Sequence, residues 1–395
     1  MTSVTGANIR RLREDRGWSQ ARLARETCRA AGIPDDAPSF GRQAISRYET
    51  GKRTPREWLP FIAQALDVTV NDLKAHQGSI PLPVPLPDQD DARGDDYAHA
   101  IRRMSRRLVV LDNEMNGLPI ADMAARAFKA VHRRLGEGAY EPRYERDIRA
   151  AAAELAEVAG WALFDAEKHD TARRFNQEAL LLARLSGDRA IELLILQNIG
   201  MQSGWLGRPR EEIAIARSIL EQGGLPPRVE AIFRTREARG LSASGQESES
   251  ANAFDHARSL LGDGEKIGDP FWAWWITAEE IDGHQACEFE KVGDWAKAIP
   301  LLQQNLSCQE RQQVGYRGIY SARLLASFLG VRAWREAEEL AESIIPTVSE
   351  IASIRTLNVL AEAARKGEAA IDAPPNLRAA LHGVGEAINE DPYTL

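Results

Sequence analysis

The stretch that decides the fold of the N-terminal part of the chain reads Arg42-Gln43-Ala44-Ile45-Ser46-Arg47-Tyr48-Glu49-Thr50-Gly51-Lys52-Arg53. It predicts a short helix over residues 42–49 that stops at Gly51, since glycine is common where helices end. By its spacing Ile45 faces the core, and Tyr48 is expected to pack there as well. The remaining face of the helix is polar and basic.

Four more helices are expected around this one. The first carries Ile9 and Leu12 and ends at Gly17, and the second opens at Gln20 after Ser19, a suitable N-cap. A fourth and a fifth helix follow, and the apolar residues of all these helices recur at helical spacing. Together the helices supply the expected core residues Leu12, Leu23, Ala24, Ile45, Ile62 and Leu66, with Trp58, Val70 and Leu73 marking the last two helices.

These residues resemble the Cro/repressor-like (XRE) helix-turn-helix family. The resemblance rests on Ile9-Arg-Arg-Leu12, Gly17-Trp-Ser-Gln20, Ile45-Ser-Arg-Tyr-Glu-Thr-Gly-Lys-Arg53 and Ile62-Ala-Gln-Ala-Leu66. One departure is an insertion of about eleven residues around Arg29–Ser39, where the family has a short turn. Similar insertions occur in actinobacterial regulators that join such a domain to a C-terminal domain resembling tetratricopeptide (TPR) repeats. The insertion either lengthens the second helix or forms a loop over the DNA backbone.

The resemblance implies that the helix over 42–49 enters the major groove of double-stranded DNA, where each base pair shows a distinct pattern of donors and acceptors. Arg42 is suited to bidentate contact with guanine and Gln43 with adenine. Ser46, one turn after Arg42, is expected to reach a base or a phosphate. The competing interpretation of these side chains is a solvated polar helix face.

The other predicted DNA-binding residues contact phosphates. Arg47, Lys52 and Arg53 are expected to set the register on the duplex without reading sequence. The family resemblance places Gln20, at the start of the second helix, against a phosphate. Residues 1–77 hold 13 Lys/Arg and 9 Asp/Glu, a net charge of +4 in a chain of net charge −8, which suits an anionic partner.

Alternating prolines over residues 81–87 and an acidic run over 88–96 predict a linker at 78–96. The chain therefore divides into a helix-turn-helix domain (1–77), this linker, and a helical body (97–395). From residue 97 the pattern is almost wholly helical, so the predicted fold class is all-α. The three cysteines form no CxxC, and no secretory signal or membrane span is recognised, so a cytoplasmic protein is expected.

A degenerate repeat runs through the body. Similar positions recur at Ala172, Ile213, Ser250, Ala298 and Ala337, with spacings of 41, 37, 48 and 39 residues. This pattern resembles the tetratricopeptide (TPR) repeat, whose usual period is about 34 residues. The resemblance implies an α-solenoid in which neighbouring helix pairs bury their apolar stripes jointly.

Two sets of residues are candidates for ligand binding in the groove of the body. Asn198, Gln202 and Trp205 lie at helical spacing, and so does a second set that combines aromatics with acids. The second set is Trp272, Trp275, Glu279 and Asp282. Aromatic and acidic side chains suit a cationic or peptide ligand, but packing between repeats explains Trp205, Trp272 and Trp275 equally well. For Trp161, Trp295 and Trp334 packing is favoured.

No HExxH, GxSxG or phosphate-binding loop motif occurs, and the seven histidines lack metal-ligand spacing. We therefore expect no enzyme activity, no cofactor and no metal. The sequence predicts a transcriptional regulator that dimerises through its body and senses a peptide, small molecule or protein partner. The alternative is an interaction scaffold whose DNA-binding head only localises it.

Overall fold

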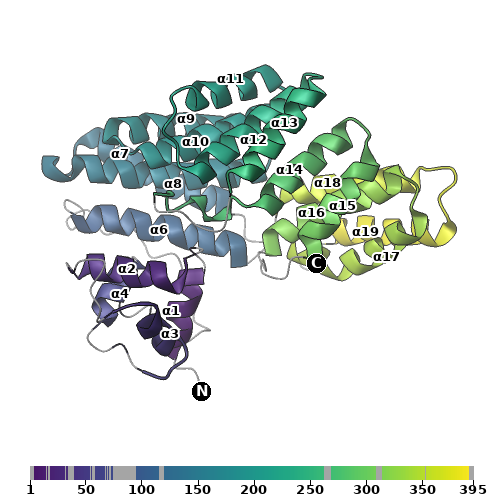
Figure 1. The fold of residues 1–395 in the computed structure, drawn as a ribbon. Helices are drawn as coiled ribbons and strands as arrows, with labels where there is room; N and C mark the ends of the chain where they lie inside the picture. Colours follow the sequence, from purple (N-terminus) through teal and green to yellow (C-terminus); the bar gives the residue numbers. More distant parts are fainter. Residues whose placement is uncertain are drawn as a thin grey trace. The chain divides into compact units, whose positions relative to one another are not determined.

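The computed structural model is helical throughout the residues it describes and contains no strand among them, which confirms the predicted all-α fold (Figure 1). The described residues are 4–14, 16, 18–31, 33, 40–53, 55, 58–66, 68, 70, 73, 95–114, 120–261, 268–307, 314–351 and 353–390. The predicted linker lies almost entirely outside them. Its last two residues are an exception, because helix α6 begins at Asp95.

Contacts within the chain define two compact units. The first, called the head unit below, comprises residues 1–84 and 263–275. The second, the body unit, comprises residues 85–262 and 276–395.

Within the described residues, the head unit contains four α-helices, and their apolar faces meet in one core. They are α1 (Val4–Glu14), α2 (Gln20–Ala30), α3 (Arg42–Glu49) and α4 (Leu59–Ala65). Helix α2 packs against α3 and α4, and α1 packs against α3. Ile9, Leu23, Ile45, Ile62 and Leu66 are fully buried in this core, while Leu12 packs against it partly buried.

The ends of α2 and α3 are where the sequence places them. The Ser19 hydroxyl accepts a hydrogen bond from the backbone N–H of Arg22 at 3.1 Å and caps α2. Gly51 has φ of 71°, a left-handed conformation that glycine adopts without strain, directly after the C-cap of α3. The predicted fifth helix lies mostly outside the described residues, although Leu73 is fully buried.

The body unit is a succession of helices (Figure 1). The first seven are α6 (Asp95–Glu114), α7 (Ile120–Glu137), α8 (Glu145–Asp165), α9 (His169–Ser186), α10 (Arg189–Trp205), α11 (Pro209–Leu220) and α12 (Pro227–Ala243). They are followed by α13 (Glu247–Ser259), α14 (Ala278–Lys291), α15 (Trp295–Ser307), α16 (Val314–Gly330), α17 (Trp334–Ile344), α18 (Ile354–Glu368) and α19 (Pro375–Asn389). Short 3-10 segments cover Pro142–Tyr144, Ala273–Trp275 (in the head unit) and Ile345–Glu350.

From α8 onward the body helices form consecutive pairs. Each of α8, α10, α12, α14, α16 and α18 packs against the helix that follows it. These first helices of the pairs also contact one another in sequence, α8 with α10 and so on to α18. A helical solenoid is consistent with this packing.

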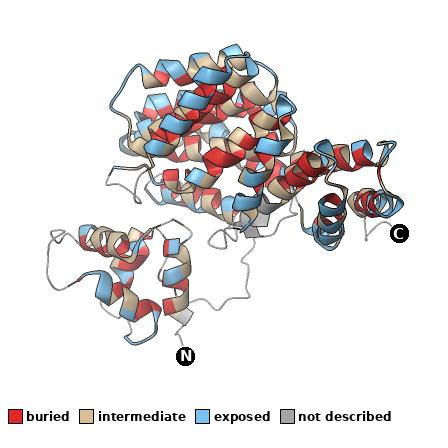
Figure 2. Ribbon diagram, turned by 45° about the vertical axis from the view of Figure 1, so that its right-hand side comes forward, coloured by how far each residue is buried: buried red, intermediate tan, exposed pale blue. Residues whose placement is uncertain are grey.

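The aligned repeat positions occupy equivalent places in the pairs. Each is the fourth or fifth residue of the second helix of its pair, in α9, α11, α13, α15 and α17. Ala172, Ala298 and Ala337 are fully buried there, Ser250 is buried and Ile213 is partly buried. Figure 2 shows the resulting pattern, with buried residues along the sides where helices face each other. Small side chains at these places allow two helices to approach closely.

Candidate nucleic-acid interface

Helix α3 has two faces of opposite character. Arg42, Gln43 and Arg47 are exposed, and Ser46 is half-exposed on the same side. Ile45 is fully buried on the other side, in the core of the head unit. Because residues four apart share one side of a helix, the four polar residues form a continuous outer surface, which we call the α3 face.

Tyr48 belongs to the inner side of α3. It is 3% exposed, and its ring lies 6.2 Å from that of Phe40, which in turn stacks on Trp58 at 3.9 Å. The prediction that Tyr48 packs in the core is confirmed. An aromatic cluster of this kind fixes the rotation of α3 about its own axis, and so determines which side chains it presents.

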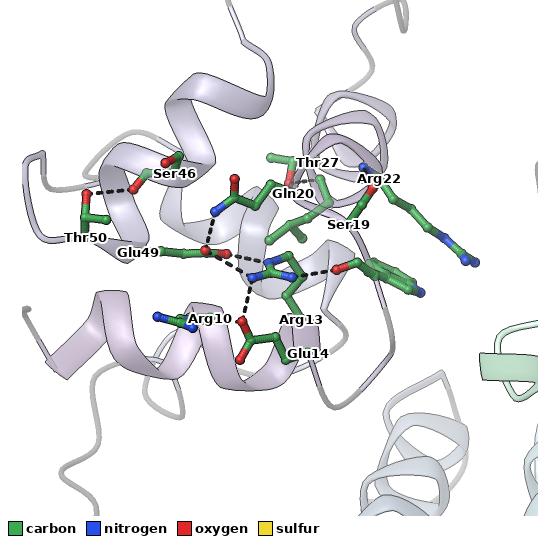
Figure 3. Close-up of polar contacts among 12 residues, drawn as sticks. Arg10, Arg13, Glu14, Ser19, Gln20, Arg22, Thr27, Ser46, Glu49 and Thr50 are labelled. Carbon is green, nitrogen blue, oxygen red and sulfur yellow. Dashed lines mark hydrogen bonds and ion pairs between the residues drawn. The ribbon is translucent and has the colours of Figure 1, made fainter. Parts of the chain in front are cut away.

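A buried charged network holds the C-terminal end of α3 (Figure 3). The Arg13 guanidinium of α1 donates to both carboxylate oxygens of Glu49, at 2.6 and 3.2 Å. Arg13 also donates to the carbonyl oxygen of Trp18 at 2.6 Å. The Arg13 and Glu49 side chains are 10% and 2% exposed, so this bidentate pair is shielded from solvent and positions α3 against α1.

Gln20 joins the same network. Its Nε2 donates to Glu49 Oε2 at 2.7 Å, which ties the start of α2 to the end of α3. An amide nitrogen carries two N–H groups, so this bond occupies one of them and leaves the other for an anion. The sequence interpretation assigned Gln20 to a phosphate and did not include Arg13 or Glu49. The signal for Glu49 was an acid four residues after Ile45, on the side of α3 that faces the core.

The turn after α3 adds cations to the exposed surface. Lys52 and Arg53 are exposed, and the backbone N–H of Arg53 donates to the carbonyl oxygen of Arg47 at 3.2 Å, which folds the turn back onto α3. Within the described part of the chain, the side chains of Arg42, Arg47, Lys52 and Arg53 form no ion pair. Four unneutralised cations around one short helix create a positive surface that attracts a polyanion.

The insertion between α2 and α3 begins at the end of α2. That helix ends at Ala30, and the backbone N–H of Ile33 donates to the carbonyl oxygen of Cys28 at 2.9 Å. Helix α2 is therefore extended by at most two residues beyond the stretch predicted to be helical. Residue 32 and residues 34–39 lie outside the described residues.

The two polar candidates on α10 make contacts inside the body unit. Asn198 donates from Nδ2 to Glu157 Oε1 at 2.7 Å, and Gln202 donates from Nε2 to the carbonyl oxygen of His169 at 2.8 Å. Both side chains are buried. The Trp205 ring meets Phe164 edge-on at 6.0 Å. These contacts favour the packing interpretation over an open peptide-binding stripe.

The second candidate set does not form one stripe, and that expectation is wrong. Trp272 and Trp275 lie in or beside the 3-10 turn of the head unit, whereas α14 begins only at Ala278, after Thr277 caps it. Glu279 and Asp282 are therefore on a helix that does not include the tryptophans. Asp282 is buried and accepts a hydrogen bond from Arg258 Nε at 2.7 Å. The apparent periodicity crossed a helix boundary that the Thr277 cap defines.

The tryptophans that were expected to pack make such contacts. The Trp295 ring lies over Gly330, the Trp334 side chain packs against the C-terminal core, and the Trp161 ring lies 5.8 Å from that of Phe164. Among the residues that the structure describes, no group of three His, Cys, Asp or Glu side chains is arranged to hold a metal ion. No helix within the described ranges has the length and apolar character needed to cross a membrane.

Comparison with protein families identifies the head. A family model described as a helix-turn-helix domain matches residues 6–76, which include most of α1, all of α2 to α4 and the whole α3 face. A comparison with curated proteins finds no match. The N-terminal part of this all-helical chain is therefore a helix-turn-helix domain, the class of domain that binds DNA through a helix in a groove.

Proposed function

We propose that the protein is a sequence-specific regulator of transcription that binds double-stranded DNA through an XRE-type head. The α3 face carries this proposal, because it gathers two base-reading side chains and a cation on one exposed surface. Helix α3 is eight residues long, and its buried Glu49 and Tyr48 hold it rigidly against α1 and the core. Rigid presentation lowers the entropy cost of forming specific contacts.

The proposed role of each DNA-binding residue follows from its chemistry and its position. Arg42 and Gln43 occupy the first turn of α3, the part of a recognition helix that meets base edges. We assign them to guanine and adenine, with Ser46 reaching a base or a phosphate. Arg47, Lys52, Arg53 and Gln20 flank this turn and are assigned to phosphates, which fix the register.

In this proposal the body unit is a TPR-like module that forms the dimer and senses a signal. The protein as a whole is cytoplasmic and has no catalytic activity. Dimers of helix-turn-helix proteins bind two half-sites about one helical turn apart. Leu181 and Leu185, one turn apart on α9 and 51% and 53% exposed, supply apolar surface for a contact between copies or with a protein partner. A peptide or small molecule bound by the body would alter how the two heads are presented.

The test compares two arginines on a DNA site selected from random duplexes. Arg42→Ala is expected to cost about 1–3 kcal/mol and to relax specificity at one base pair. Arg53→Ala is expected to weaken all sequences alike and to reduce the slope of log affinity against log salt by about 1. Binding is measured by fluorescence anisotropy over a salt series, and analytical ultracentrifugation gives the number of chains per duplex.

Arg335→Ala is the matched control, because this arginine of α17 has an 86% exposed side chain outside the head unit. It should bind DNA as the unmodified protein does. Equal losses on every sequence from Arg42→Ala and Arg53→Ala would remove Arg42 as a base reader. No preference among random duplexes at physiological salt would end the proposal.

A further inference from the structure

Three aromatic rings of the body unit surround an arginine from a distant part of the chain. The guanidinium carbon of Arg355, in the first turn of α18, lies 5.4 Å from the ring centres of Phe164 and Trp205 and 6.0 Å from that of Trp161. Trp161 and Phe164 come from the last turn of α8, and Trp205 is the last residue of α10. We call these three rings together with Asp165 the aromatic site.

A carboxylate completes the recognition of this cation. Arg355 donates from Nε to Asp165 Oδ1 at 3.0 Å, and its Nη2 lies 2.9 Å from the same oxygen. The Arg355 and Asp165 side chains are 15% and 20% exposed, so the contact reaches the surface and is yet largely desolvated. A planar guanidinium that lies against aromatic rings and also bonds to a carboxylate is strongly bound. A lysine ammonium makes only some of these interactions.

A second carboxyl group lies near that of Asp165. Burial, together with repulsion from Asp165, raises the pKa of Asp112 of α6 to about 6. In the described ranges, Asp112 forms no ion pair. Asp112 therefore adds negative charge beside Asp165 only when it is ionised.

Arg355 is held in a way that permits exchange. It is separated from Asp165 by 190 residues, and a second side-chain bond between these two regions runs from Asn358 to Glu167. Arginine reaches the site through a long side chain with several rotatable bonds, so it can leave by changing rotamer while α18 keeps its place. A guanidinium group of a ligand would then contact the same three rings and the same carboxylate.

We propose that the aromatic site is a ligand site of the body unit, that it recognises the guanidinium of an arginine-bearing ligand, and that Arg355 occupies it as an internal competitor. This deepens the sensing role proposed above and depends on it for its biological purpose. Binding to the site is measured without DNA, so the two proposals fail independently. The ligand displaces Arg355 and breaks the bonds between Arg355 and Asp165 that link α18 to α8.

The experiment removes the Arg355 side chain from the aromatic site and then adds an arginine analogue from solution. Full-length Arg355→Ala is titrated calorimetrically with N-acetyl-L-arginine amide, beside the unmodified protein. The variant is expected to bind the probe about tenfold or more tightly, because no internal guanidinium competes. N-acetyl-L-lysine amide should bind about tenfold more weakly than the arginine probe. A separate titration uses free L-arginine. If the amide binds more tightly, the natural ligand is an arginine within a peptide; if free arginine binds more tightly, the ligand is the amino acid.

Two further variants keep the outcome interpretable. Arg332→Ala removes an arginine with a 70% exposed side chain that pairs with Asp372, and it should bind the probe no better than the unmodified protein. Arg355→Ala combined with Asp165→Asn should lose the gained affinity, and circular dichroism confirms folding. If Arg355→Ala is misfolded, Arg355→Gln provides the same comparison with a polar side chain in place. The proposal is overturned if the vacated site binds no probe, binds both probes equally, or retains its affinity without Asp165.

Discussion

The head and body units use arginine in opposite ways. Arg42, Arg47 and Arg53 of the head are exposed and, within the described residues, unpaired. Arg236 and Arg239 of the body are buried, at 2% and 4% exposure, and each has polar partners within its own unit. Exposed arginines of the head are therefore available to bind external anions, and we call them readers. Buried arginines of the body instead link helices to one another, and we call them connectors.

The buried arginines of the body connect helices of neighbouring pairs. Arg239 of α12 lies 3.8 Å from a carboxylate oxygen of Glu212 and 3.3 Å from one of Glu288, on α11 and α14. Arg323 of α16 donates to Glu290 of α14 at 2.6 Å. Burial lowers the pKa of both guanidinium groups, but Glu212 and Glu288 raise that of Arg239, and Cys287 and Glu290 raise that of Arg323, so both end above the ordinary value. Such pairs require one specific arrangement of neighbouring helices, which apolar contacts alone do not.

The largest effect is expected when a connector is removed from the body. Arg239→Leu removes the buried cation that Glu212 and Glu288 share, and leaves Glu288 only its bond from the half-exposed Lys291. We expect the free energy of unfolding of the body to fall by about 3–5 kcal/mol, the usual cost of breaking a buried ion pair from one side. Urea denaturation followed by circular dichroism measures the loss.

Arg47→Leu is the matched variant in the head. It removes the same group from an exposed position, so its effect on stability should stay within about 0.5 kcal/mol. Its consequence should instead be weaker DNA binding and a smaller salt slope. Equal losses of stability from Arg239→Leu and Arg47→Leu would abolish the distinction between connectors and readers.

A half-buried acid of the body should make stability depend on pH. Burial raises the pKa of Glu157 to about 7, although the bond from Asn198 opposes the shift. The folded state therefore keeps a proton that the unfolded state releases near its ordinary pKa of 4.5. The stabilisation is complete below pH 4.5 and is lost as the pH rises through 7. Relative to Glu157→Gln, the unmodified protein should lose about 2 kcal/mol between pH 4.5 and 7.5, a value reduced for partial exposure.

Glu339→Gln provides the reference for that measurement, because the Glu339 side chain is 63% exposed. Its stability should run parallel to that of the unmodified protein over the same pH range in urea titrations. A constant difference between the unmodified protein and Glu157→Gln would show that Glu157 ionises alike in both states.

The smallest effect concerns close packing in the body. A Cβ atom at Gly240 of α12 would lie 2.5 Å from Ile213 Cγ1 and 3.0 Å from the carbonyl oxygen of Pro209. Gly240→Ala should therefore cost about 1–2 kcal/mol, because the Ile213 side chain yields but the backbone does not. Thermal unfolding compared at one pH measures the cost.

Gly385→Ala tests the same substitution where no atom lies within 4 Å of the added Cβ, near the end of α19. It should stabilise the protein by about 0.5–1 kcal/mol, the helix preference of alanine over glycine. A loss there as large as that at Gly240 would mean that crowding does not explain the first result.

Local patterns predicted the head more completely than the candidate groove of the body. The Ser19 cap, the stop at Gly51 and the inward face of Ile45 all depend on neighbours a few residues away, which the sequence displays directly. The stripe through Trp272 and Asp282 depended on one helix continuing across Thr277. A polar residue that caps a helix looks the same in a sequence as one within it, so the boundary was missed.

What the sequence determined by itself is the succession of helices, their apolar sides and the basic outer surface of α3, because helical periodicity and capping are local properties. Only the tertiary structure decided which charges meet. The pairing of Arg13 with Glu49 and the capture of Arg355 by the aromatic site join residues 36 and 190 positions apart. A charged side chain shows its sign in the sequence, whereas its partner is fixed by how the helices pack and by the need to satisfy every charge that packing buries.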